Sequence, residues 1–240
     1  MNLKFLFITL FLLPSSLKAQ IGEHRSTLSI GGNGGITLGS IDFDPTIRQS
    51  QLIQPTFGLT LRYTCEKYFT TVCAIQAELN YTRLGWKEDI MNGNNQKLPD
   101  TYQRELTYLQ LPLMARLAWG REERGMMFFL LLGPQISYYL GQSVRHSNIW
   151  TLNGEGFPDR PNKVYQQYEM DPQHKFDYGL TVGIGTELNT SIGHFMIEGR
   201  YYLGLADIYK NSKKDVFARS AHRVIAVKAT YLFDVIHSGN

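Results

Sequence analysis

Residues 194–205 read HFMIEGRYYLGL and place a glutamate and an arginine two positions apart in an apolar, aromatic segment. In a helix, Glu198 and Arg200 would project in different directions. In a strand they share one face, and the opposite face, which begins at Phe195, carries no charge. The stretch therefore predicts a strand whose uncharged face needs an apolar environment.

The same two-residue period recurs along the chain. Ile75 and Leu79, for example, alternate with Gln76 and Glu78. Polar stretches separate eight such segments, at 27–38, 55–65, 72–85, 105–119, 126–141, 175–189, 194–206 and 222–235. Such alternation fits a membrane β-barrel, but it also fits a water-soluble β-sandwich. Other features of the sequence must therefore decide between these two folds.

Charge on one face of the segments and its near absence from the other favour a membrane barrel. We expect the charged side chains of the polar face to point into a common lumen: Arg62, Glu78, Arg116, Asp177, Glu187, Glu198, Arg200 and Lys228. The apolar face is nearly free of charge over about eight to ten residues, the length of a tilted membrane strand. Aromatic residues such as Trp86 and Trp119 gather toward segment ends, where membrane interfaces favour them.

The connectors between the segments alternate in length. Those after the second, fourth and sixth segments are short (EKYFTT, REERG and TSIG), and the others are longer. Outer-membrane barrels have short turns at one end, long loops at the other and an even number of strands. We predict an all-β fold, an eight-stranded antiparallel transmembrane β-barrel of the outer-membrane type, with both termini in the periplasm and the uncharged face of 194–205 in lipid.

Residues 1–19 have the pattern of a cleaved signal peptide. Lys4 precedes the apolar run 5–13, and Ala19 ends a polar cleavage region. The predicted organisation is a signal peptide at 1–19 and a barrel domain at 20–240, exported to the outer membrane. Cleavage removes two lysines and no acid, so the formal charge falls from +3 to +1. A nearly neutral chain argues against a nucleic-acid partner.

Six stretches carry a family resemblance: AIQAELNYTRLGWKE (74–88), YLQLPLMARLAWG (108–120), LLLGPQISYYL (130–140), FDYGLTVGIGTEL (176–188), IEGRYYLGLADI (197–208) and IAVKATYLFD (225–234). On these stretches the chain resembles the PorT-like outer-membrane β-barrel family of Bacteroidetes. The resemblance implies the barrel fold and a non-enzymatic role in envelope integrity or as an accessory to protein secretion. A secretion or envelope protein complex is the partner that this role implies, and the apolar strand face and the long loop add outer-membrane lipid and lipopolysaccharide as expected partners.

The lumen set holds four acids and four bases, and this balance predicts ion pairs. An eight-stranded barrel leaves an interior that side chains can just fill, and an unpaired buried charge is costly. For Glu198 and Arg200, strand parity favours Arg116, Lys228 and Glu187 as partners. A small channel is the alternative interpretation.

Two cysteines, Cys65 and Cys73, flank the short connector that follows the second segment. They share a parity across the hairpin, and export permits oxidation, so a disulfide is the favoured prediction over free thiols.

No motif for a catalytic, cofactor or metal site occurs, and the six histidines lack metal-ligand spacing. We therefore expect a protein that is not an enzyme. A lipid-modifying Ser/His pair at the rim would leave no local motif and stays as a minor alternative.

The longest loop, 142–174, carries the candidate contact residues Trp150, Phe157, Arg160 and Tyr165. Exposed aromatic rings beside bases suit contact with lipopolysaccharide, glycan or protein, which gives a surface-binding module as a further alternative. A loop that packs on itself over the barrel mouth explains the same residues.

Overall fold

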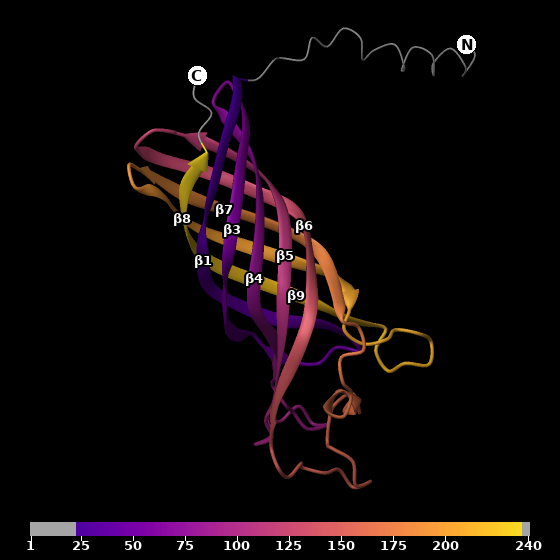
Figure 1. Ribbon diagram of the computed structural model, residues 1–240. Helices are drawn as coiled ribbons and strands as arrows, with labels where there is room; N and C mark the ends of the chain where they lie inside the picture. The colour runs from indigo at the N-terminus through magenta and orange to yellow at the C-terminus, as the bar shows by residue number, and fades with distance from the viewer. Residues whose placement is uncertain (1–22, 237–240) are drawn as a thin grey trace, which may run out of the picture.

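The computed structural model describes residues 23–236, which form one closed antiparallel β-barrel (Figure 1). The predicted signal peptide, 1–19, lies outside the described residues. Between residues 23 and 236, no helix is long and apolar enough to cross a bilayer.

Eight long strands make up the ring: β1 (Glu23–Asp44), β3 (Leu52–Tyr68), β4 (Thr71–Glu88), β5 (Tyr102–Gly120), β6 (Gly125–His146), β7 (Phe176–Thr190), β8 (Gly193–Asp207) and β9 (Arg219–Ile236). Each pairs with the next along the chain, and β1 pairs with β9 to close the barrel. The short β2 (Gln49–Ser50) adds a two-residue ladder beside the end of β4. The predicted eight-stranded fold is confirmed.

The two ends of the barrel differ (Figure 1). Turns at 69–70, 121–124 and 191–192 join strands at the end where β1 begins and β9 ends. The longer loops, 45–51, 89–101, 147–175 and 208–218, lie at the opposite end. Because outer-membrane barrels place short turns in the periplasm, we expect the long loops on the extracellular side.

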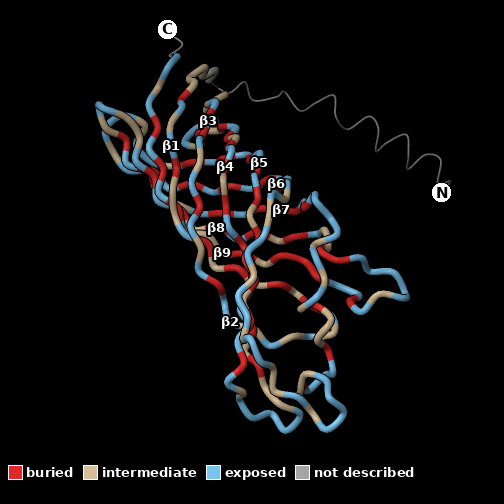
Figure 2. Tube along the Cα trace, turned by 60° about the horizontal axis from the view of Figure 1, so that its bottom comes forward, coloured by how far each residue is buried: buried red, intermediate tan, exposed pale blue. Residues whose placement is uncertain are grey.

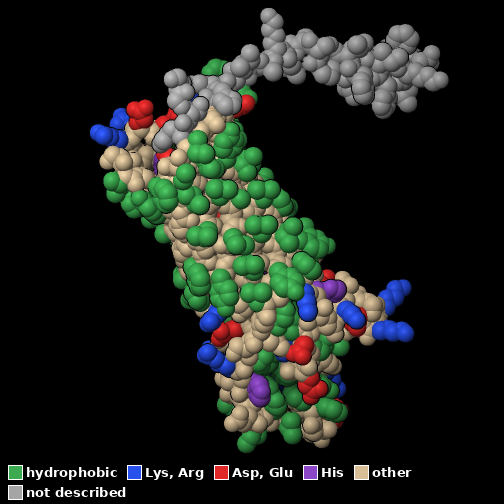
Figure 3. Space-filling model, in the orientation of Figure 1, with side chains coloured by type: hydrophobic (Ala, Val, Ile, Leu, Met, Phe, Trp, Pro, Cys, Tyr) green, Lys and Arg blue, Asp and Glu red, His purple; other side chains and the backbone are tan. Residues whose placement is uncertain are grey.

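Burial alternates along the strands, as the sequence period requires (Figure 2). On β8, Ile197 is 65% exposed while Glu198 is only 2% exposed. Figure 3 shows the outward side chains of the visible face as a broad apolar belt across the barrel. Gly133 on β6 illustrates the close packing of the wall, because a Cβ there would lie 2.0 Å from the Leu113 carbonyl oxygen.

Several strands continue past the apolar belt on the loop side. Residues 39–52, 83–107, 141–175 and 206–223 form what we call the extracellular extension. It has an aromatic core of its own, in which Phe43 lies 5.3 Å from Trp86 and 5.1 Å from Phe217 between ring centroids. These side chains are almost fully buried and hold the loops in place.

Candidate functional site

One charge cluster in the lumen is centred on Glu78 of β4. Arg200 on β8 donates from Nη1 and Nη2 to the two Glu78 oxygens at 2.9 and 2.5 Å. Lys228 on β9 donates to Glu78 at 2.6 Å, and Arg200 also donates to Glu198 at 2.6 Å. All four side chains are buried. Because β4 and β8 lie on opposite sides of the ring, the cluster links opposite walls of the barrel.

A second cluster, centred on Glu187 of β7, lies toward the periplasmic end. Arg62 Nη1 donates to both Glu187 oxygens at 2.8 Å, and Arg116 donates to the same carboxylate. His194 Nδ1 lies 2.9 Å from Glu187, and its Nε2 lies 3.0 Å from Asp234. Five strands are therefore joined around one acid.

Side chains fill most of the lumen between these clusters and the extension. The space that remains beside Arg200 is a cavity of about 30 Å³, lined by Thr37, Asn80 and Gln135 among others. That volume has room for roughly two water molecules. At the periplasmic end, Glu122 of the turn 121–124 reaches across to Lys67 at 2.5 Å.

In the extracellular extension, loop 147–175 packs against the ends of β4 and β5 through Gln167, which contacts Glu88 and Tyr102. The Arg160 guanidinium is buried, pairs with Asp100 at 3.3 Å and donates from Nε to the Tyr168 hydroxyl at 2.8 Å. The Trp150 ring stacks on Tyr168 with 4.6 Å between centroids. The loop therefore packs on itself, as one of the two sequence interpretations had it.

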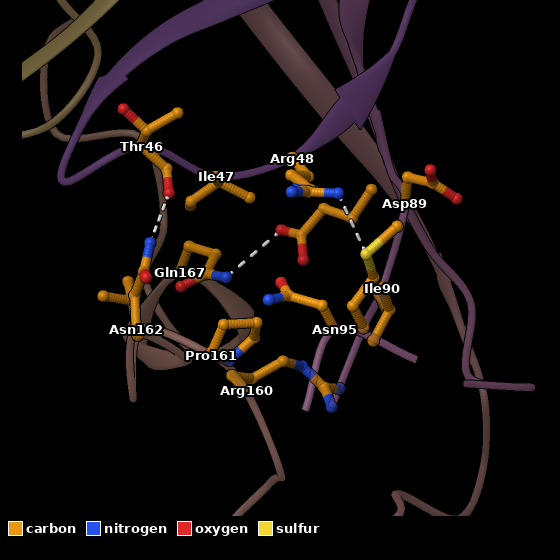
Figure 4. Close-up of a pocket in the computed structure, with 13 residues that line it drawn as sticks. Thr46, Ile47, Arg48, Asp89, Ile90, Asn95, Arg160, Pro161, Asn162 and Gln167 are labelled. Atoms are coloured by element: carbon orange, nitrogen blue, oxygen red, sulfur yellow. Dashed lines mark hydrogen bonds between the residues drawn. The ribbon is translucent and has the colours of Figure 1, made fainter. Parts of the chain in front are cut away.

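A pocket of about 260 Å³ opens between this loop and the ends of β1 and β4 (Figure 4). Glu88 forms its floor and accepts hydrogen bonds from Trp86 Nε1 at 3.3 Å, Gln167 Nε2 at 3.2 Å and the Tyr168 hydroxyl at 2.8 Å. Glu88 lies beyond the apolar belt, and burial raises the pKa of its carboxyl above the usual range. Burial, together with the nearby Glu88, also raises the pKa of Tyr168. Neutral donors thus hold this acid in place.

The chain matches the family described as "Outer membrane protein beta-barrel domain" over residues 18–210. This chain belongs to that family. Its described strands form the closed ring that the family description implies, with lipid-facing apolar side chains and a charged lumen. The chain is an outer-membrane β-barrel protein.

Solved structures similar to this outer-membrane barrel come from three bacteria. Ail, the attachment invasion locus protein of Yersinia pestis, is 14% identical, with 88% of this chain and 99% of that chain covered and a TM-score of 0.36. OprG from Pseudomonas aeruginosa is 11% identical, with 89% and 96% covered and a TM-score of 0.45. Neisserial surface protein A is 11% identical, with 85% and 95% covered and a TM-score of 0.42. No curated protein matches the chain.

The lumen partners of this outer-membrane barrel differ from those that strand parity favoured. Arg200 contacts Glu78 and Glu198, whereas Glu187 contacts Arg62 and Arg116. Parity fixes the face of a side chain, but it says nothing of which residues meet across the lumen. Lys228 is opposite Glu198 in the β8–β9 register, yet its amine forms its ion pair with Glu78.

Asp177 lies apart from both clusters of the barrel. Its carboxylate accepts a hydrogen bond from the Tyr202 hydroxyl at 2.9 Å.

Conversely, His194 and Asp234 belong to the Glu187 cluster, although neither was among the predicted lumen residues. His194 has the same parity as Glu198 in the stretch 194–205, and that signal was sufficient to find it.

The predicted disulfide is wrong, because both thiols are free. A β-bulge interrupts the β3–β4 ladder after Thr64, and the register then places Glu66 opposite Cys73. The extra residue moves Cys65 out of the facing position that equal parity implied.

The four predicted contact residues of the barrel's long loop have different environments. Arg160 is buried and serves the packing of the loop, which corrects its expected role as a surface contact. Trp150 is half-buried against Tyr168. Phe157 is 49% exposed and stacks on Tyr165 at 5.7 Å, so this pair remains available at the surface.

Basic side chains border the apolar belt of the barrel on the loop side (Figure 3). Arg83 and Lys87 are exposed on the outer face of β4, immediately after the lipid-facing Tyr81. Across the register, Lys87 faces Gln103, and Gln103 faces the exposed Arg145 of β6. We call Arg83, Lys87 and Arg145 the basic border; it lies beside the apolar belt, where we expect the headgroups of the outer leaflet.

Proposed function

We propose that this chain is a non-enzymatic outer-membrane protein that binds a partner at the cell surface through its extracellular extension. The observation that carries the proposal is the packed aromatic core of the extension, in which Phe43, Trp86 and Phe217 meet. A barrel that served only as a membrane anchor would not need a second core outside the membrane. Such a core holds loops in fixed positions, which reduces the entropy lost on binding.

The lumen supports a binding role over the alternative of a channel. The ion pairs of Glu78 and Glu187 bridge strands across the interior, and the cavity beside the Glu78 cluster has a volume of only about 30 Å³. Lipid contact fits the proposal too. The basic border would attract the phosphates of lipopolysaccharide, and the apolar belt would meet its acyl chains.

The proposal is tested by replacing residues 148–174 with a short Gly-Ser connector in a deletion strain. As a control, the periplasmic turn residues 191–192 are replaced by Asn-Gly. Both variants must show heat-modifiable gel migration, because Val164 of the replaced loop packs against the aromatic core. We expect the loop variant to lose attachment to glycan- or protein-coated surfaces and the turn variant to keep it. A loop variant that attaches like the wild type contradicts the proposal.

A second candidate is the role implied by the PorT-like resemblance, in envelope integrity or protein secretion. A cavity of about 470 Å³ at the periplasmic mouth, lined by Arg62, Lys67, Glu122 and Glu123 among others, favours it. Such a mixed-charge surface would suit a periplasmic protein partner. The loop variant should then restore secretion and detergent resistance to the deletion strain fully, whereas Lys67→Glu should not.

We also propose that residues 1–19 are removed on export. The mass of the mature chain, measured on protein extracted from outer membranes, tests the cleavage site.

A further inference from the structure

We propose that the extracellular pocket above Glu88 binds a neutral saccharide residue. This inference rests on the proposed surface-binding role and names the ligand class that the extension would take. The pocket, about 260 Å³ in volume, is of the size of one small polar ligand rather than a drug-sized one.

The floor of the pocket combines Glu88, which already accepts three hydrogen bonds, with one acceptor that has no donor. Glu88 is 6% exposed, and among the described residues no lysine or arginine comes within ion-pair distance of it. Gln167 is 1% exposed, and its Oε1 has no hydrogen-bond donor in the described part of the chain. A buried acceptor without a donor is costly, so a ligand with hydroxyl groups would complete this floor.

The rim of the pocket offers donors. Arg48 Nη1 contacts the Met91 sulfur at 3.1 Å, which is a weak acceptor for a guanidinium. Asn95 is exposed, adopts a φ of 60°, and lies across the pocket from Gln167 (Figure 4). A ligand must therefore donate at its inner end and accept at its outer end.

The charges around the pocket select against ions. Two guanidinium groups, Arg48 and Arg160, line it and disfavour an ammonium ligand. Two carboxylates, Glu88 and Asp89, line it as well and disfavour an anion. A hydroxyl group is neutral and both donates and accepts, so a sugar satisfies floor and rim together.

The remaining wall is apolar. Ile47, Ile90 and Val164 line it, and Ile90 and Val164 also belong to the core of the extension. The C–H face of a pyranose ring would pack against these side chains and bury apolar surface. Polar groups at floor and rim with an apolar wall are the common composition of a small-molecule site.

The test uses the full mature chain refolded in detergent and saturation-transfer difference NMR. The probes are glucose, galactose, mannose and N-acetylglucosamine, with glucosamine and N-acetylneuraminic acid as charged probes. We expect transfer to at least one neutral sugar and none to the charged probes. Transfer to no neutral sugar, or transfer that the charged probes match, would overturn the inference.

Two variants test whether the sugar binds in the pocket above Glu88. Ile47→Trp fills the pocket from its rim and should weaken sugar binding roughly tenfold or more. Ile149→Trp makes the same change at an 85% exposed position of the same extension, outside the pocket, and should leave binding unchanged. Equal binding by the two variants would place the sugar elsewhere and overturn the inference. Surface attachment of cells with the replaced loop is measured separately, so the proposed function can stand when the sugar site fails.

Discussion

Arg200 on β8 and Glu78 on β4 form a two-point ion pair across the lumen, with N–O distances of 2.5 and 2.9 Å. The two strands are not neighbours in the ring, so the pair braces the barrel through its interior. Arg200 also contacts Glu198, and Lys228 contacts Glu78, so two bases face two buried acids in this cluster.

Replacing Arg200 with Leu should destabilise the barrel by about 3 kcal/mol, because Glu198 loses the base that it contacts. Urea unfolding of the refolded chain measures the loss. Adding Glu198→Gln to Arg200→Leu should recover part of it, since the orphaned charge is then removed. An unfolding midpoint that does not move would show that the ion pairs contribute nothing to stability.

The purified barrel should give no steady conductance in a planar bilayer, because the Glu78 and Glu187 clusters fill the lumen. Arg200→Ala combined with Lys228→Ala removes two long side chains from the interior and should raise the frequency of small openings. A stable ohmic current from the wild-type chain would instead support the channel alternative.

Both cysteines should react with a thiol reagent in the unfolded, unreduced chain, giving two equivalents per molecule. The measurement is quantitative labelling in denaturant, with a reduced sample for comparison. The bulge after Thr64 sets Glu66, not Cys65, opposite Cys73 and explains the expected result. Labelling that appears only after reduction would contradict the free-thiol geometry.

We expect lipopolysaccharide to raise the thermal stability of the refolded barrel, and replacing Arg83 and Lys87 with Glu should abolish that rise. The reason is that the basic border would then repel the phosphates of the lipid. Heat-modifiable gel migration against temperature measures this stabilisation. Arg124→Glu at the exposed periplasmic turn is the matched control and should leave the lipid effect intact. If Arg124→Glu lost the stabilisation by lipopolysaccharide to the same extent, that stabilisation would not depend on the basic border.

The strands were predictable because successive side chains face lipid and the lumen in turn. Phe195 and Ile197 face lipid while Glu198 and Arg200 face the lumen, and that contrast is visible in the sequence. The strand ends were not predictable, since β4 continues to Glu88 and β6 to His146 after the lipid-facing alternation stops. Leu84 and Trp86 of β4 lie beyond the belt, and they pack in the core of the extension instead of facing a charged lumen. Inward-facing positions are therefore apolar there, although inward-facing positions within the belt carry the charges.

For the charge clusters of the lumen, the sequence predicted which side chains point inward but not which of them form ion pairs. Parity placed Glu78 and Glu187 in the lumen, but their partners depend on how far each strand is staggered around the ring. The pocket above Glu88 joins residues from three separate loops, such as Arg48, Asn95 and Gln167. No local pattern links such residues, because only the closed fold brings them together.

Phe43 lies in β1, the first strand of the ring, and Phe217 directly precedes β9, the last strand; their ring centroids are 5.1 Å apart. This contact exists only after β1 has paired with β9 along the closing seam. A chain stalled with that seam unzipped would insert a curved sheet into the membrane but would expose a disordered surface. If the extension binds a partner as proposed above, only a barrel that has closed along this seam would bind it.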